Sequence, residues 1–149
     1  KKNLYQEVLN AQAVVFFKLI DDIRQMNMSP LTKLRHYVDA LSKIQETNPE
    51  SIPLICRELL APQPIFEKFV KNKLYALHQF MTELVEQAIE CKEIHTDIKP
   101  THVAFTIEST IMFFFLTQHQ VQELGNYAPG EQGIYLTQVL ETYLASLSK

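Results

Sequence analysis

The sequence predicts an all-α domain of six helices, and three observations support this. Apolar residues recur at intervals of three and four rather than two, which is the period of a helix with one buried face. Glycine occurs only three times, at Gly125, Gly130 and Gly133. The chain has 149 residues, of which 46% are hydrophobic, so it can bury a core as one unit. We therefore expect a single domain over residues 1–149.

Two helices are expected in the first third of the chain. The first covers residues 3–27, where apolar side chains form one stripe: Leu4, Tyr5, Val8, Leu9, Val15, Phe16, Leu19, Ile20 and Ile23. Ser29 and Pro30 then resemble a helix N-cap followed by a first-turn proline. They predict a second helix that ends near residue 46, with its apolar face at Leu31, Leu34, Val38 and Leu41.

A short third helix and a long fourth helix should follow. Asn48 and Pro49 repeat the start signal, and Pro53 fits a helix ending near residue 60 only if it lies in the first turn. Prolines at positions 62 and 64 break the chain. The fourth helix then runs to residue 91 or 92 and carries Phe66, Phe69, Val70, Leu74, Leu77, Met81, Leu84, Ala88 and Ile89 at helical spacing.

The last two helices differ from the others in how they distribute apolar residues. Pro100 should begin a fifth helix to residue 124, after a polar link over 94–99. Its middle, residues 111–116, is apolar on every side and must be covered on two faces. The three glycines and Pro129 mark a loop, and the sixth helix follows over 134–147.

Composition excludes some functions and favours one location. The net charge is -3 and only three arginines occur, so this chain should not hold DNA tightly by itself. The longest apolar stretch, 103–116, is interrupted at 108–110 and is shorter than the roughly 20 residues of a membrane span. Two distant cysteines and no recognisable signal peptide predict a reducing, cytoplasmic location.

No catalytic or metal-binding motif stands out. No glutamate has a histidine three residues later, as a di-iron bundle requires, and neither a nucleophile elbow nor a phosphate loop is present. One cluster gathers possible metal ligands, but without tetrahedral spacing: Glu90, Cys91, Glu93, His95 and Asp97. We interpret it as a solvated helix end and expect neither a metal nor a cofactor.

Several side chains are candidates for contact with a small molecule. Aromatic residues from four of the expected helices could line an apolar cavity, although each could equally belong to the core. Arg57 could contact a ligand or form an ion pair, and His78 could hydrogen-bond a ligand or a core neighbour. The candidate ligand-binding residues are Phe16, Phe17, Ile20, Tyr37, Leu41, Arg57, Phe69, His78 and Phe113.

The fifth and sixth helices predict a homodimer. One sixth helix cannot easily cover both faces of residues 111–116, whereas a second copy of the chain could complete a four-helix bundle about a two-fold axis. The alternative is a monomer that buries this segment internally. The expected interface residues are Phe105, Ser109, Met112, Leu116, Tyr135, Val139 and Tyr143.

Two segments resemble the TetR family of transcriptional regulators. Residues 2–9, Lys-Asn-Leu-Tyr-Gln-Glu-Val-Leu, resemble the junction at which the last helix of the DNA-binding domain passes into a long connecting helix. Residues 57–64, Arg-Glu-Leu-Leu-Ala-Pro-Gln-Pro, followed by Phe66, are similar to the Arg-Glu-Leu and proline break of family sensor domains. The family's three-helix DNA-binding module is absent from this sequence, which begins at Lys1 without a methionine, so we expect a piece of a longer protein.

The resemblance implies the ligand-sensing and dimerisation domain of a transcriptional regulator, in the simplest case a repressor. A small apolar or amphipathic effector would alter DNA affinity, the first helix would act as a lever, and operator DNA would be contacted only through the missing N-terminal domain. Two other functions stay open from the residues alone. One is a helical protein-interaction adaptor without a small-molecule ligand, and the other is a cofactor-free enzyme that uses Glu58 or His78.

Overall fold

The computed structural model describes residues 2–126, 128 and 131–147, and the described residues are helical without any strand. The expected all-α class is therefore confirmed. The elements are α1 (Lys2–Gln25), α2 (Pro30–Thr47), α3 (Ser51–Leu60), the 3-10 turn η1 (Pro64–Phe66), α4 (Glu67–Glu90), α5 (Pro100–Gly125) and α6 (Glu131–Ser146).

Local signals account for several helix ends. The Ser29 hydroxyl accepts a hydrogen bond from the backbone N–H of Thr32 at 3.4 Å, and Pro30 is the first residue of α2. Pro53 is the third residue of α3, where it displaces no intrahelical donor. At the end of α5, Asn126 adopts a left-handed conformation with φ 51°, which asparagine tolerates better than most residues.

Two helix boundaries and one additional turn differ from expectation. The first helix ends at Gln25 rather than near residue 27, and the sixth begins at Glu131 rather than near 134. The turn η1 was not expected: Pro64 lacks a backbone N–H, so it favours a helix start, and one tight turn forms before α4 begins.

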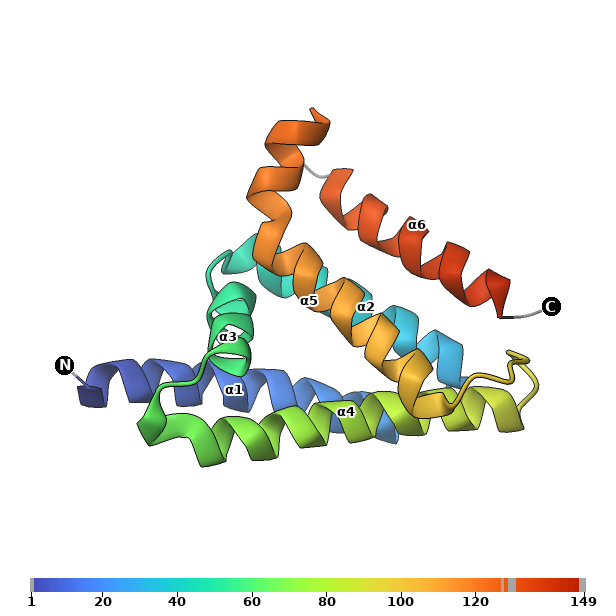
Figure 1. Ribbon diagram of the computed structural model, residues 1–149, viewed down its shortest axis with the longest axis horizontal. Coiled ribbons are helices and arrows are strands. Elements are labelled where there is room, and N and C mark those ends of the chain that lie inside the picture. Colours follow the sequence, from blue (N-terminus) through green and yellow to red (C-terminus); the bar gives the residue numbers. More distant parts are fainter. Residues whose placement is uncertain (1, 127, 129–130, 148–149) are drawn as a thin grey trace.

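The helices form two crossing groups (Figure 1). Helices α1 and α4 extend side by side along the base of the view, and α3 contacts both of them. Helices α2 and α5 cross above this base, with the most extensive packing between α4 and α5. Helix α6 lies against α5 and α2. The first five helices thus surround a common interior, and α6 closes one side.

One hydrophobic core runs through all six helices. Its most deeply buried large side chains come from α1, α2, α4, α5, α6 and the α4–α5 link: Phe80, Phe115, Ile20, Ile23, Leu41, Met81, Ile94, Ile107, Leu136 and Val103. A smaller cluster around Leu9 and Val70 packs the N-terminal half of α1 against α3 and α4. Burial of these side chains is the main favourable contribution to the fold.

The predicted buried face of α1 is wrong at three positions. Leu4, Val8 and Val15 are exposed, whereas Leu9, Ala13, Phe16, Ile20 and Ile23 are buried. Residues 13–17 are apolar without interruption, and a helix cannot turn five consecutive side chains toward one face. The contacts with α2, α3 and α4 therefore decide which of them are buried.

The link between α4 and α5 has a structural role. The Glu93 carboxylate accepts a hydrogen bond from the backbone N–H of Leu31 at 3.0 Å, and the His95 N–H donates to the Leu147 carbonyl at 2.6 Å. The link therefore ties the start of α2 to the end of α6. Within the described residues, no three His, Cys, Asp or Glu side chains gather as a possible metal site.

None of the helices in the described part of the chain is both long and apolar enough to span a bilayer.

Candidate ligand-binding site

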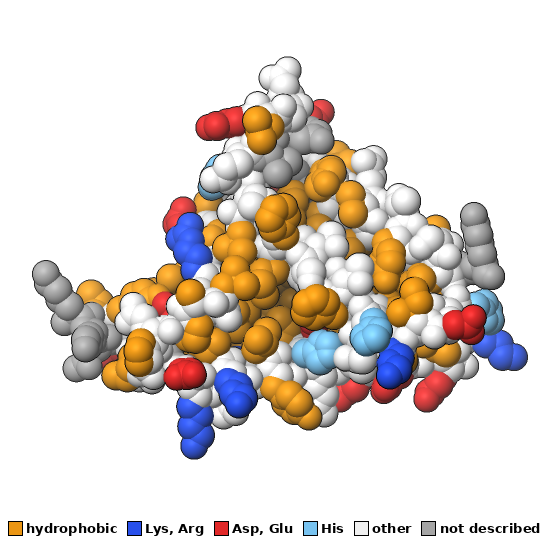
Figure 2. All heavy atoms as spheres, viewed as in Figure 1, with side chains coloured by type: hydrophobic (Ala, Val, Ile, Leu, Met, Phe, Trp, Pro, Cys, Tyr) orange, Lys and Arg blue, Asp and Glu red, His pale blue; other side chains and the backbone are white. Residues whose placement is uncertain are grey.

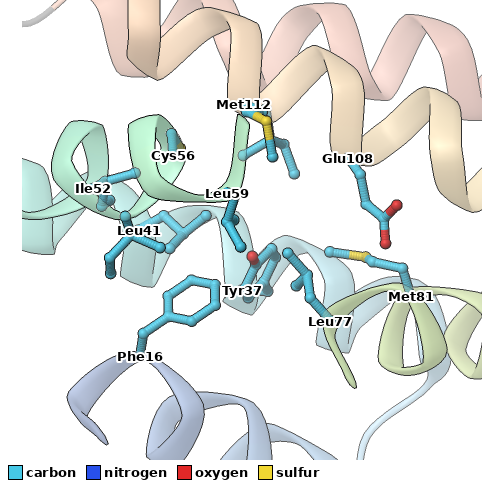
Figure 3. A pocket seen from close by; sticks show the side chains of 12 residues that line it. Phe16, Tyr37, Leu41, Ile52, Cys56, Leu59, Leu77, Met81, Glu108 and Met112 are labelled. Carbon is cyan, nitrogen blue, oxygen red and sulfur yellow. The ribbon is translucent and has the colours of Figure 1, made fainter. Parts of the chain in front are cut away.

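A cavity lies where the first five helices meet. The free space inside it is about 30 Å³, which is room for roughly two water molecules. Figure 3 shows the side chains around it. The lining residues are Phe16 of α1; Tyr37 and Leu41 of α2; Ile52, Ile55, Cys56 and Leu59 of α3; Leu77 and Met81 of α4; and Glu108, Ile111 and Met112 of α5.

Helical spacing explains why these residues share a cavity. The four residues from α3 occupy positions i, i+3, i+4 and i+7, so they form one continuous face of that helix. The two residues from α2 are four positions apart, as are the two from α4, and the three from α5 occupy positions i, i+3 and i+4. Helices α2, α3 and α4 therefore each present an apolar stripe to the cavity, α1 contributes Phe16, and α5 contributes Ile111 and Met112 together with Glu108.

Aromatic packing fixes one wall of the cavity. The rings of Phe16 and Tyr37 meet edge to face with centroids 6.2 Å apart, and Tyr37 meets Phe80 in the same way at 5.8 Å. Phe16 also contacts the ring of Phe17 at 5.1 Å. Such pairs hold ring orientations, so the wall between α1 and α2 is built before any ligand arrives.

Glu108 is the charged residue in this otherwise apolar lining. Its Oε2 lies 2.9 Å from Nδ1 of His78, whose Nε2 lies 2.7 Å from the hydroxyl of Thr101. Its Oε1 is buried without a hydrogen-bond partner in the described structure. Burial raises the pKa of Glu108, and the hydrogen bond and charge of His78 only partly oppose that shift.

Two more titratable groups in the lining have a raised pKa. Burial raises the pKa of the Tyr37 hydroxyl, with further contributions from Cys56 and Glu108. Burial also raises the pKa of the Cys56 thiol to about 12, against the opposing charge of Arg57. At neutral pH both groups are therefore protonated, and they add no charge to the cavity.

The structure places the expected ligand residues in three groups. Phe16, Tyr37 and Leu41 line the cavity. Phe17 and Phe69 lie in a neighbouring hollow between α1 and α4, where the Lys73 ammonium sits 4.6 Å and 5.6 Å from their ring centres. That these five residues contact a ligand remains a prediction.

The remaining candidates lie outside the lining. Ile20 is in the core, and His78 stands behind Glu108. Arg57 is exposed, because the inward positions of α3 are taken by the apolar stripe. Phe113 is 67% exposed on the outer face of α5, so the structure separates it from the cavity.

The contributions of α3 were not predicted from the sequence, nor were those of Leu77, Met81, Glu108, Ile111 and Met112. The stripe on α3 is visible in the sequence as four apolar residues at helical spacing on either side of Arg57 and Glu58. Glu108 was visible as one carboxylate inside the longest apolar stretch. A charge at such a position needs a partner or a function.

Helix α3 also contacts α1 through its other face. Glu58, which is buried, accepts a hydrogen bond from the hydroxyl of Tyr5, and Ser51 bonds to the side chain of Gln12. The Glu58 carboxylate also lies 3.4 Å from the backbone N–H of Gln63. One short helix therefore connects the cavity wall to the N-terminal half of α1.

The expected interface residues lie on α5 and α6. Phe105 is 65% exposed, Tyr135 is 37% exposed and Ser109 is exposed, whereas Met112, Leu116, Val139 and Tyr143 are half-buried. Tyr135 stacks on Phe114 with ring centroids 6.0 Å apart, which joins the two helices. Apolar side chains are also visible on one face of the molecule in Figure 2.

Comparison with known proteins identifies the family. The model of the family described as "YcdC-like protein, C-terminal region" matches residues 14–142, which include all of the cavity lining. A search of curated proteins found no match. The match covers most of the chain, and this chain therefore belongs to the YcdC-like family of TetR-type C-terminal domains.

Proposed function

We propose that the chain is the ligand-sensing and dimerisation domain of a TetR-like transcriptional regulator, in the simplest case a repressor in the cytoplasm. A small apolar or amphipathic effector binds the cavity and changes the affinity of the whole protein for DNA. Operator DNA is contacted by an N-terminal helix-turn-helix domain outside this sequence. This assignment makes the chain a regulatory domain rather than an enzyme.

The observation that carries this proposal is the cavity bounded by five helices. Its walls are apolar apart from Glu108, and because the free space inside is small, a small organic molecule would have to move the helices apart to bind there. Glu58 and His78, the two candidates for catalysis, lie in separate places: Glu58 is bonded to Tyr5, and His78 to Glu108 and Thr101. This separation favours binding over catalysis.

The position of α3 supports a route from the cavity to α1. Its inner face contacts the space that a ligand would fill, and Glu58 and Ser51 bond to α1. A ligand that displaces α3 would therefore pull on the N-terminal half of α1. In a regulator of this family that half leads to the DNA-binding domain, so the displacement would alter the separation of two recognition helices.

The outer face of α5 and α6 supports the dimer. Phe105 and Phe113 project from α5 with more than half of each side chain exposed, and Ile134 is 58% exposed on α6. A second copy placed about a two-fold axis would cover this patch with the same patch of its own. Met112 lines the cavity and was expected at the interface, so it would link ligand binding to dimer packing.

Ligand binding can be tested with a simple apolar probe. Octanol should raise the thermal unfolding midpoint of the chain if it binds the cavity more tightly than it binds the unfolded chain. Phe16→Leu removes an aromatic contact from the cavity and should weaken octanol binding by roughly fivefold. Phe115→Leu makes the same change in the core outside the lining and should leave octanol binding unchanged.

Native mass spectrometry separates the two main functions. A dimer that carries a small molecule from the expression host would support the sensor. A monomer without a ligand, together with no response to octanol, would contradict the sensor and favour a protein-interaction adaptor that uses the outer face of α5.

A further inference from the structure

The wall of the cavity contains an acceptor that lacks a donor. The Glu108 side chain is 10% exposed, its Oε2 is taken by His78, and its Oε1 has no partner among the described residues. Buried carboxylate oxygens are normally satisfied, because leaving one unpaired forfeits its hydration without replacement. An unpaired oxygen on a residue that lines a cavity can therefore take its donor from a molecule bound there, once the cavity opens to it.

The surroundings of Glu108 favour a cation as that donor. None of the residues that line the cavity is a lysine or an arginine, and His78, which is 33% exposed, is already engaged by Oε2 and Thr101. The other lining groups include the aromatic rings of Phe16 and Tyr37, whose faces attract cations. Figure 3 shows the Glu108 carboxylate extending from α5 toward Met81.

We propose that the effector is an organic cation: an amine whose ammonium group donates to Oε1 of Glu108 and whose apolar body lies against the inner face of α3. This inference rests on the proposed sensor function and names the ligand class for its cavity. Hydrogen bonds between two charged groups are stronger than neutral ones, so the amine is preferred over an alcohol of equal size. A carboxylate ligand is disfavoured when Glu108 is ionised, because the two negative charges repel each other.

The raised pKa of Glu108 agrees with this assignment. Burial makes the ionised form costly in the empty cavity. An ammonium beside Oε1 opposes that cost and returns the carboxyl to its charged form. Binding of the amine should therefore release a proton from the protein whenever Glu108 is protonated beforehand.

Three ligands with one apolar body test the head group. Octylamine, octanol and octanoate differ only at the end that would meet Glu108, and their affinities for the chain can be measured by isothermal titration calorimetry. We expect octylamine to bind at least roughly tenfold more tightly than octanol, and octanoate to bind most weakly. Glu108→Gln should abolish the preference for the amine while octanol binding is retained.

Two controls separate this inference from the function on which it rests. Glu86→Gln removes a carboxylate from an exposed position of α4 and should keep the preference for octylamine. Octanol binding without any preference for octylamine would overturn the cationic effector and leave the sensor intact. Failure of all three ligands to bind would overturn both. If Glu108→Gln does not fold, the three affinities for the unsubstituted chain provide the test: tightest binding of octylamine supports a cationic effector, and any other order contradicts it.

Discussion

The hydroxyl of Tyr5 donates a hydrogen bond to the carboxylate of Glu58, which joins the beginning of α1 to the middle of α3. The two residues are 53 positions apart in the chain. Burial and the neighbouring carboxylate raise the pKa of Tyr5 to about 12, so the hydroxyl keeps its proton across the physiological range. This bond and the contact between Gln12 and Ser51 hold α1 against the helix that supplies four residues of the cavity wall.

Tyr5→Phe should weaken this connection without disturbing the core. Glu58 is buried and would keep only its contact with Gln63, so we expect a loss of about 1 kcal/mol in the free energy of unfolding, measured by urea denaturation. Tyr75→Phe is the matched control, because Tyr75 is 70% exposed on α4. Equal stability of the two variants would show that the bond contributes nothing to the attachment of α1.

Glu108→Gln should change how stability depends on pH. The pKa of Glu108 in the folded chain is raised above its ordinary value of 4.5, so the folded state holds this proton more tightly than the unfolded state. The resulting stabilisation is fully present below the ordinary value and is lost as the pH rises through the raised pKa. The free energy of unfolding of the variant, relative to that of the unsubstituted chain, should therefore be lowest near pH 4.5 and higher at about pH 7.5.

The groups that face Glu108 must be considered in that comparison. His78 bonds to it from α4, while Tyr37 and Cys56 approach from α2 and α3. Tyr37 and Cys56 stay protonated at both pH values because burial raises the pKa of each. Urea denaturation of both proteins at the two pH values measures the difference in their free energies of unfolding. If this difference does not vary with pH, the pKa of Glu108 is the same in the folded and unfolded chain.

Phe113→Glu should dissociate the proposed dimer. The side chain is 67% exposed in a single copy, and a carboxylate there would meet its own counterpart across a two-fold axis without a partner charge. Sedimentation velocity should change from dimer to monomer, while octanol binding persists. Val14→Glu puts the same charge at an equally exposed apolar position of α1 and should leave the dimer intact. A dimer that survives Phe113→Glu would place the interface elsewhere.

Much of the fold could be predicted because its helix signals are local. Ser29 with Pro30, and Pro100, mark helix starts that depend only on neighbouring residues. The inward face was harder to predict where apolar residues are consecutive. Val15 and Phe16 are equally apolar in the sequence, yet Val15 is 57% exposed and Phe16 is buried, because tertiary contacts decide between them.

The cavity could be predicted only in part for the same reason. Phe16, Tyr37 and Leu41 were identified as aromatic or apolar residues on amphipathic helices. The pairing of Glu108 with His78 joins two helices across 30 positions, and no period in the sequence reveals such a contact. Phe113 was expected in the cavity as one of the aromatic residues. Because residues 111–116 are apolar on every side, the pattern does not distinguish the inner face of this helix from its outer face.

The two cysteines should differ strongly in reactivity, which tests whether α3 stays packed over the cavity. Cys56 is buried with its pKa raised to about 12, whereas Cys91 is exposed after the end of α4. Only the thiolate reacts, so iodoacetamide at about pH 8 should modify Cys91 at least roughly a hundredfold faster, as followed by mass spectrometry. In denaturing urea both should react readily, which provides the control. Similar rates in the folded chain would mean that α3 opens without a ligand, and a helix that opens so easily could not transmit the filling of the cavity to α1.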